Sequence, residues 1–162
     1  VTNENYIRLI NKVESLDERV SNIENNYKPQ ELKNSQLFFD GEFYDAYTLI
    51  QSIFESANNE IIIIDNYVDR TILDRLVVKN RNVKIIIYTS INTRLLGRDI
   101  NTFNSQYGGL DVRYTTNVHD RYIIIDQNKI YHLGHSIKDL GKKIFSISES
   151  DSNLISKLLS NI

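Results

Sequence analysis

The stretch that decides the fold is residues 117–138, NVHDRYIIIDQNKIYHLGHSIK. Two runs of strand-forming residues flank the turn residues Asp126-Gln127-Asn128, which is the pattern of a β-hairpin. The first of these runs is apolar throughout, as in a strand that is buried on both faces of a sheet. His119 and Arg121 precede this run and lie two residues apart, so on an extended strand their side chains would point to one face.

Strand-like and helix-like patterns alternate on both sides of this hairpin. Apolar β-branched runs predict buried strands, and apolar residues at helical spacing predict helices. Strands are expected at 37–39, 61–64, 83–88, 110–114, 122–125, 129–133 and 144–148, and helices at 45–56, 69–79, 93–106 and after Asp151. An Asp-Gly turn at 40–41 follows the first strand, and Asp69 and Asp151 are expected to cap helices. The sequence therefore predicts an α/β domain, a mixed β-sheet flanked by helices on both faces.

The N-terminal segment has a heptad repeat. Its apolar residues alternate in spacing between three and four, and they are Tyr6, Leu9, Val13, Leu16, Val20, Ile23 and Tyr27. Valine at a with leucine at d favours a two-stranded parallel coiled coil. In a parallel dimer, Lys12 and Arg19 at g would face Asp17 and Glu24 at the following e positions of the partner.

These patterns divide the chain into three parts. We expect a coiled-coil helix over residues 1–27, a polar linker over 28–35 and the α/β domain over 36–162. The alternative for the first part is an amphipathic helix that lies on its own domain. In either case Pro29, the only proline, is expected to prevent the helix from continuing.

Composition excludes several classes of protein. The 162 residues suit one domain with an appendage. The absence of cysteine excludes disulfide scaffolds and thiolate metal sites, and no motif with metal-ligand spacing is present. No apolar run approaches the length of a membrane span, and the N-terminus does not have the pattern of a signal peptide. We therefore expect a cytoplasmic protein without membrane contact, and the lack of methionine at position 1 indicates a piece of a longer chain.

The charge distribution is uneven. Nineteen basic and twenty-one acidic residues leave a net charge of −2, which argues against a purely electrostatic binder of nucleic acid. Seven of the basic residues lie within 69–99, where only three acidic residues occur. This stretch is expected to be either a solvated face or a local positive surface.

His119, Arg121 and Asp126 have the spacing H-x-R-x(4)-D. A histidine beside a fixed cation suits phosphoryl chemistry, because the imidazole attacks phosphorus while the planar guanidinium holds two of its oxygens. On this pattern alone, a hydrogen-bonded structural histidine is the more common interpretation.

The same spacing resembles the HxKxxxxD motif of the phospholipase D superfamily, with Arg121 in the lysine position. The order of elements over 36–162 is similar to one half of that fold. The segments FFDGEFYDAY, IDNYVD, HDRYIIID and YHLGHSIKDLGKK also resemble the PLD-like domain at the C-terminus of phage-antirepressor-type and virulence-associated bacterial proteins.

The resemblance implies a metal-independent phosphodiesterase that needs no cofactor, and we expect a nuclease that acts on DNA or RNA. Two copies of the motif form one site in that superfamily: one histidine becomes a phosphohistidine, and the other protonates the leaving group and then activates water. This chain has one copy, so the resemblance implies a homodimer with His119 of each subunit in a shared site. The heptad repeat predicts a parallel two-fold dimer on separate grounds.

The resemblance also implies roles for individual residues. Arg121 would bind the substrate phosphate, Ser136 would orient a phosphate oxygen or a histidine, and Asp126 would orient the motif. The superfamily motif continues with Gly-Ser and then Asn, but here His135 separates Gly134 from Ser136. Lys138 occupies the asparagine position and is expected to bind substrate. These departures support the alternative, a catalytically silent PLD-like module that dimerises and binds nucleic acid or a partner.

Several further residues are candidates for supporting roles. A carboxylate is needed to fix the tautomer of His119, and Asp65 and Glu149 are both candidates. Tyr67 is expected either to line the cleft or to pack in the core. The remaining polar candidates are expected to be solvent-exposed, although the two lysines could contact backbone phosphates; they are His132, His135, Lys142 and Lys143.

Overall fold

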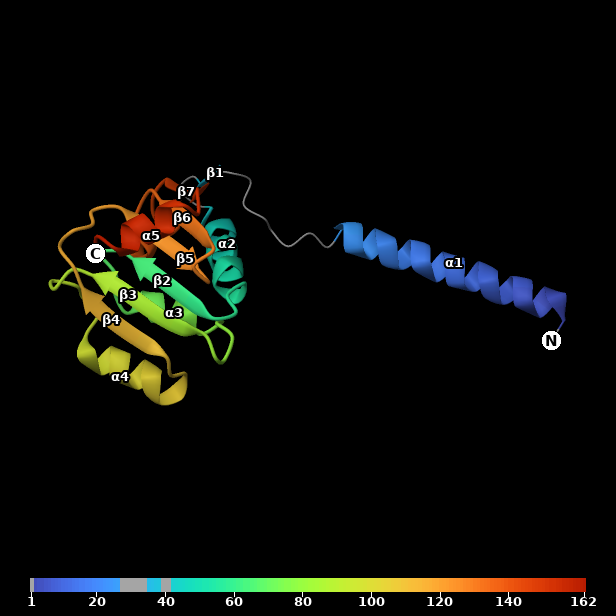
Figure 1. Ribbon diagram of the computed structural model, residues 1–162, viewed down its shortest axis with the longest axis horizontal. Coiled ribbons are helices and arrows are strands. Elements are labelled where there is room, and N and C mark those ends of the chain that lie inside the picture. The colour runs from blue at the N-terminus through green and yellow to red at the C-terminus, as the bar shows by residue number, and fades with distance from the viewer. Residues whose placement is uncertain (1, 27–34, 39–41) are drawn as a thin grey trace. The chain divides into compact units, whose positions relative to one another are not determined.

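The computed structural model describes residues 2–26, 35–38 and 42–162, which form two compact units. The first unit contains the helix α1, Asn3–Asn26 (Figure 1). Its apolar heptad side chains are all exposed along one helix, and they are Tyr6, Leu9, Val13, Leu16, Val20 and Ile23. Tyr27, the expected linker up to residue 34, and the turn at 40–41 lie outside the described residues.

The second unit is built on a seven-stranded sheet in the described part of the chain. The strands are β1 (Ser35–Phe38), β2 (Glu60–Ile64), β3 (Lys84–Thr89), β4 (Leu110–Tyr114), β5 (Arg121–Ile125), β6 (Lys129–Leu133) and β7 (Phe145–Ser150). Their order across the sheet is β1-β7-β6-β5-β2-β3-β4. Strands β2, β3 and β4 are parallel, and the other pairs are antiparallel, so the predicted mixed sheet is confirmed.

Helices cover both faces of this sheet, as the sequence predicts (Figure 1). On one face pack α2 (Phe43–Glu55), α3 (Thr71–Leu76) and α4 (Gly97–Gln106), and on the other packs α5 (Leu154–Leu159). The four consecutive isoleucines of β2 explain this arrangement. The larger core lies between the sheet and α2, α3 and α4, and the smaller core lies between the sheet and α5. Because side chains alternate along a strand, Ile61 and Ile63 point into the larger core, and Ile62 and Ile64 point into the smaller core.

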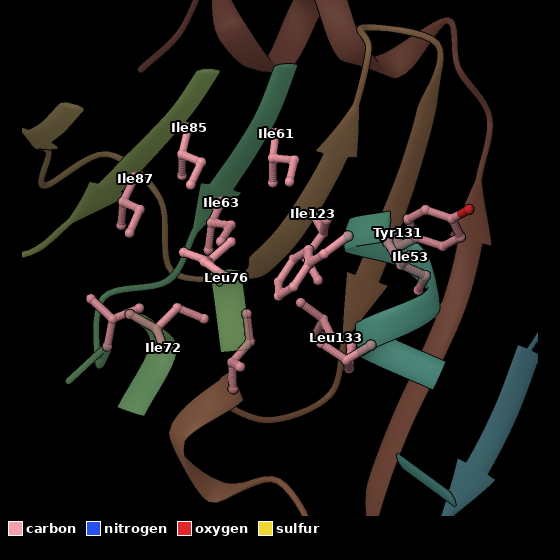
Figure 2. Packing of buried hydrophobic residues seen from close by; sticks show 14 of the residues in the cluster. Ile53, Ile61, Ile63, Ile72, Leu76, Ile85, Ile87, Ile123, Tyr131 and Leu133 are labelled. Carbon is pink, nitrogen blue, oxygen red and sulfur yellow. The ribbon is translucent and has the colours of Figure 1, made fainter. Parts of the chain in front are cut away.

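The larger core lies between the sheet and helices α2 and α3 (Figure 2). Isoleucine side chains from β2, β3 and β5 stand in rows on the sheet and meet Ile53 of α2 and Ile72 and Leu76 of α3. Burying such side chains contributes roughly 1.5–3 kcal/mol each relative to leaving them in water. This core holds the strands in register and therefore determines which loops meet at the ends of the sheet.

Two expected helices are shorter in the structure than the sequence predicts. The helix expected over 69–79 spans Thr71–Leu76, and the Asp69 carboxylate caps it by accepting the N–H of Thr71 at 2.9 Å. The helix expected over 93–106 begins only at Gly97. Thr93 instead donates its hydroxyl to the carbonyl of Val68 at 2.9 Å, which ties this segment to the loop after β2.

The predicted hairpin is confirmed. Strands β5 and β6 pair in register, and the turn between them places Asp126 and Gln127 at φ of 51° and 52°. Ile125 pairs with Lys129, so the loop has three residues, and it is closed by the Asn128 N–H, which donates to the Ile125 carbonyl at 2.9 Å. The Asp151 side chain accepts the N–H of Asn153 at 2.9 Å, just before α5, which agrees with the predicted cap.

Replacing Ile63 by alanine should lower the free energy of unfolding by about 2–5 kcal/mol, because the side chain is fully buried and its removal leaves a cavity. The control is Ile91→Ala, since Ile91 is largely exposed and its loss should change stability by less than about 0.5 kcal/mol. Urea denaturation followed by circular dichroism measures both. Equal losses for the two variants would contradict this core.

Candidate active site

Four of the predicted site residues, His119, Arg121, Ser136 and Lys138, come from one end of the sheet, and Asp126 lies at the other. Strands β2 and β3 end there, β5 begins there because it is antiparallel to β2, and β6 ends beside the start of β5. We call this end the carboxyl edge. The register pairs Ile64 with Tyr122 and Arg121 with Leu133, so the residues just beyond them gather at this edge.

His119 does not lie on strand β5. The strand begins at Arg121, and residues 117–120 form a bend before it, so the alternation of side chains along β5 does not fix the direction of His119. His119 itself is exposed, while its neighbour Val118 is buried in the smaller core. The Asn66 side chain donates to the carbonyl of Val118 at 2.6 Å, so the backbone before His119 is anchored while its imidazole faces solvent.

Arg121 lies on β5 with its guanidinium 5.4 Å from the centre of the Tyr67 ring. The Arg121 Nε is buried and has no hydrogen-bond partner among the described residues. A buried donor on a charged group without a partner is costly, and such a position is typical of a ligand site. Tyr67 is 56% exposed, so it lines this edge, and the alternative that it packs in the core is wrong.

Asp65 does not pair with His119 in the structure. Its carboxylate is fully buried and accepts the Ser136 hydroxyl at 2.8 Å, the Ile137 N–H at 2.9 Å and the Tyr67 N–H at 2.9 Å. Three donors compensate for the cost of burying this group. Asp65 therefore joins the loop after β2, which carries Tyr67, to the loop after β6, which carries Ser136.

Ser136 is almost fully buried, and its hydroxyl is directed at Asp65. In this arrangement Ser136 is a positioning residue of the carboxyl edge. Lys138 follows two residues later in the short 3-10 helix Ile137–Asp139, with its Nζ 3.7 Å from an Asp139 oxygen. It is partly exposed, so its charge remains available at this edge.

Asp126 lies at the opposite end of β5 from Arg121. Its carboxylate accepts the backbone N–H groups of Asn58, Asn59 and Glu60 at 2.9, 2.7 and 2.9 Å, which ties the hairpin turn to the start of β2. Partial burial opposes ionisation, but the three N–H donors outweigh it and hold the pKa of Asp126 below its ordinary value. Asp126 is thus separated from His119 by the length of the strand, its hydrogen bonds tie the hairpin turn to β2, and its assignment to the site stays a prediction.

Gly134 explains part of the departure from the superfamily motif. Its N–H donates to the Ser146 carbonyl at 2.8 Å, which continues the pairing of β6 with β7 by one residue. A Cβ at this position would clash with the Ser146 hydroxyl oxygen. The glycine therefore leaves room for the Ser146 hydroxyl in its present position.

The other candidates lie apart from His119. Glu149 is exposed on β7 opposite Tyr131, two strands away from β5, so the register does not bring it beside His119. His135 is exposed, as expected. His132 is only partly exposed: its Nε2 is 3.8 Å from an oxygen of Asp120, and its ring meets that of Tyr122 edge-on at 5.3 Å, contrary to the expected exposed polar residue.

Lys142 and Lys143 are both exposed between the 3-10 helix and β7, as expected for a solvated loop. The sequence analysis did not single out Asn66, which anchors the backbone before His119, or Asp120, which lies 3.8 Å from His132. The available signal for Asn66 was its position directly after the buried strand and Asp65. For Asp120 the signal was its place between His119 and Arg121.

The described residues contain no cluster of three or more histidine, aspartate or glutamate side chains that could hold a metal ion. None of the described helices has the length and apolar character needed to cross a membrane.

Changing Asp126 to Asn should destabilise the protein by about 1 kcal/mol at neutral pH, because a partly exposed charged acceptor of three N–H groups is lost. Since the pKa of folded Asp126 is lowered, its contribution is fully present above the unfolded pKa of about 4 and is lost as pH falls through the folded value. The gap between wild type and variant should therefore close in acid. Urea denaturation from pH 7 to pH 3 measures it, with Glu149→Gln as the control. A gap independent of pH would refute this role.

Changing Ser136 to Ala should lower stability by about 1–2 kcal/mol, since the buried Asp65 carboxylate loses one of its three donors. Ser146→Ala, which alters an exposed serine on β7, is the matched control and should change little. Thermal unfolding of both variants makes the comparison. Unchanged stability in Ser136→Ala would contradict a positioning role through Asp65.

No protein-family description and no curated protein sequence matches the chain. Among solved structures, the chain is similar to NucT from Helicobacter pylori, at 17% identity and a TM-score of 0.59 over 78% of this chain and 91% of that one.

It is also similar to TrmBL2, an archaeal chromatin protein whose structure shows a novel mode of DNA binding (16% identity, TM-score 0.53, 97% of this chain and 61% of that one). A third similar structure is phosphatidylserine synthase from Haemophilus influenzae (12% identity, TM-score 0.53, 78% of this chain and 37% of that one). The chain spans less than two thirds of these last two proteins. At such identities the likeness shows the fold alone. That fold is the phospholipase D-like α/β fold, which is the fold expected from the resemblance of the H-x-R-x(4)-D motif.

Proposed function

We propose that the protein is a metal-independent phosphodiesterase, acting as a nuclease through a His119 phosphohistidine in a site shared by two subunits. The observation that carries the proposal is the pairing at the carboxyl edge of an exposed imidazole with a guanidinium whose Nε is buried and unpartnered in the described part of the chain. A phosphodiester oxygen bound by the accessible part of the Arg121 side chain would bring phosphorus within reach of His119, two residues away. The similarity of fold to NucT adds support.

The chemistry follows from these two groups. A neutral His119 attacks phosphorus, and the bond from phosphorus to one strand's oxygen breaks as His119 of the partner subunit donates a proton to that oxygen. The partner's His119 then takes a proton from water, which attacks the phosphohistidine and breaks its P–N bond. Arg121 and Lys138 offset the negative charge that develops on the phosphoryl oxygens.

Two features support the proposed homodimer. This sequence holds a single copy of the motif, and in the proposed dimer the second catalytic histidine is His119 of the other subunit. Helix α1 carries an exposed apolar row at heptad spacing, and its flanking charges are complementary across a parallel dimer: Lys12 with Asp17, and Arg19 with Glu24. A parallel coiled coil has a two-fold axis, and two domains related by that axis can each contribute the same edge to one site.

A second candidate function is a catalytically silent module that dimerises and binds nucleic acid or a partner. It is favoured by Arg121 in place of lysine and by the Ser136 hydroxyl, which is directed at Asp65. The similarity of fold to TrmBL2, a chromatin protein, is also compatible with it. Both candidates use the same phosphate-binding edge, so turnover is what separates them.

The purified protein should cleave DNA or RNA in the presence of EDTA, and His119→Ala should reduce this cleavage by at least about a hundredfold, because it removes the nucleophile and the acid at once. The control is His135→Ala, which removes an exposed histidine from the loop that also carries Ser136 and should retain activity. Gel assays on labelled single and double strands make the measurement. Cleavage that survives His119→Ala would refute the phosphohistidine route, and no cleavage of any strand by the parent protein would favour the silent module.

A further inference from the structure

Helices α3 and α4 line one cavity of about 420 Å³, which we call the α3–α4 groove. Its walls come from one face of each helix, including Arg70 and Asp74 on the α3 side and Arg98 and Tyr107 on the α4 side. A volume of this size lies within the range of small-molecule sites. His119 does not line the groove, but Arg70 and Arg98 from the basic stretch over 69–99 do.

The two arginines of the groove lie at the starts of their helices. Arg70 immediately precedes α3, which follows β2, and Arg98 is the second residue of α4, which follows β3. Both helices therefore begin at the end of the sheet where β5 starts with Arg121. Strands β5, β2 and β3 are neighbours, and two strand spacings amount to about 10 Å. A polymer held at Arg121 can continue into the groove within a few units.

Charge and aromatic character are separated along the groove. Arg70 and Arg98 are exposed at its near end, and neither forms an ion pair in the part of the chain that the structure describes. At the far end the rings of Phe103 and Tyr107 pack 5.0 Å apart, and Tyr107 is 39% exposed. Cations near the edge and an accessible ring beyond them suit a phosphate followed by its base.

The acidic residues of the groove further restrict the kind of ligand that it can bind. Asp74 and Asp99 balance the two arginines, and the Asp99 side chain also accepts the N–H of Leu96 at 3.3 Å. An electrically balanced groove does not favour a bare polyanion. A nucleotide, by contrast, presents one phosphate to arginine and N–H groups on its base to a carboxylate.

We propose that the α3–α4 groove binds a nucleotide of a single-stranded nucleic acid that continues from the phosphate at His119. Arg70 and Arg98 hold its phosphate, and its base lies against Tyr107. The strand must be single, because a base paired in a duplex cannot enter a groove and stack on a side chain. The inference rests on the proposed function in one respect, since the strand is taken to be the substrate of the His119 site.

The test measures binding without turnover. The parent is the full chain with His119→Ala, and the probes are fluorescein-labelled oligo-dT, oligo-rU and a DNA duplex, followed by fluorescence anisotropy over a range of salt concentrations. Adding Arg70→Ala and Arg98→Ala should raise the Kd for the single strands about tenfold or more, because two charged contacts are lost. The slope of log Kd against log salt should fall by about 0.7 for each phosphate contact removed.

Two further variants keep the result interpretable. Lys157→Ala removes an exposed cation from α5 on the other face of the sheet, and it should leave Kd and the salt slope unchanged. Arg70→Lys with Arg98→Lys keeps both charges and should recover the salt slope, which separates loss of contact from loss of folding.

The inference would be overturned if the double alanine variant kept the Kd and the salt slope of the parent, or if Lys157→Ala weakened binding as much as the double variant does. It would also be overturned if the double alanine variant weakened binding of the duplex as much as binding of the single strands, or if the parent bound neither single strand. Cleavage in EDTA is measured separately, so cleavage that persists while the groove variants bind like the parent separates a failure of the groove from a failure of the proposed function.

Discussion

Hydrogen bonds to the buried Asp65 carboxylate hold the carboxyl edge of the sheet together. The group receives donors from the loop after β2 and from the loop after β6, segments that are seventy residues apart in sequence. A buried carboxylate is tolerated only when such donors surround it, so the two loops have little freedom to separate. Tyr67 and Ser136 are positioned through this single group, and Arg121 stacks on the ring that it positions.

At the other end of the sheet, the Asp126 carboxylate also joins two segments by accepting hydrogen bonds. Its donors are three backbone N–H groups at the start of β2. The motif spacing then has a simple physical meaning. The four residues between Arg121 and Asp126 are those that cross the sheet, so the spacing reports the length of β5. Five strand residues span roughly 16 Å, which is why two residues of one motif serve opposite ends of the molecule.

The apolar core brings together the groups that form the hydrogen bonds to Asp65 and to Asp126. Alternating isoleucines on β2 face two separate cores, and the register they enforce with β3 and β5 brings the loop ends to common positions. The loops that leave the carboxyl edge then carry nearly all the polar features of interest: His119, Tyr67, Ser136 and the starts of α3 and α4. A rigid sheet with functional residues on its loops is a common division of labour in α/β proteins.

The sequence by itself determined the elements, because apolar periodicity and turn chemistry are local. The isoleucine run of β2, the hairpin about Asp126 and the heptad of α1 are all legible without contacts. It also pointed to His119 and Arg121 as the residues to examine. Helix lengths were predicted less well, since Thr93 leaves the expected helix to bond with Val68, a residue distant in sequence.

Only the tertiary structure decided the partnerships. Asp65 and Glu149 were equivalent carboxylate candidates in the sequence, but the register places Glu149 two strands from β5 and buries Asp65 against Ser136. The sequence left two possible roles for Tyr67, and the structure shows that its ring is exposed and lies against the Arg121 guanidinium. The physical reason is general: which polar groups meet depends on strand order and register, and these are set by packing between segments that lie far apart in the chain.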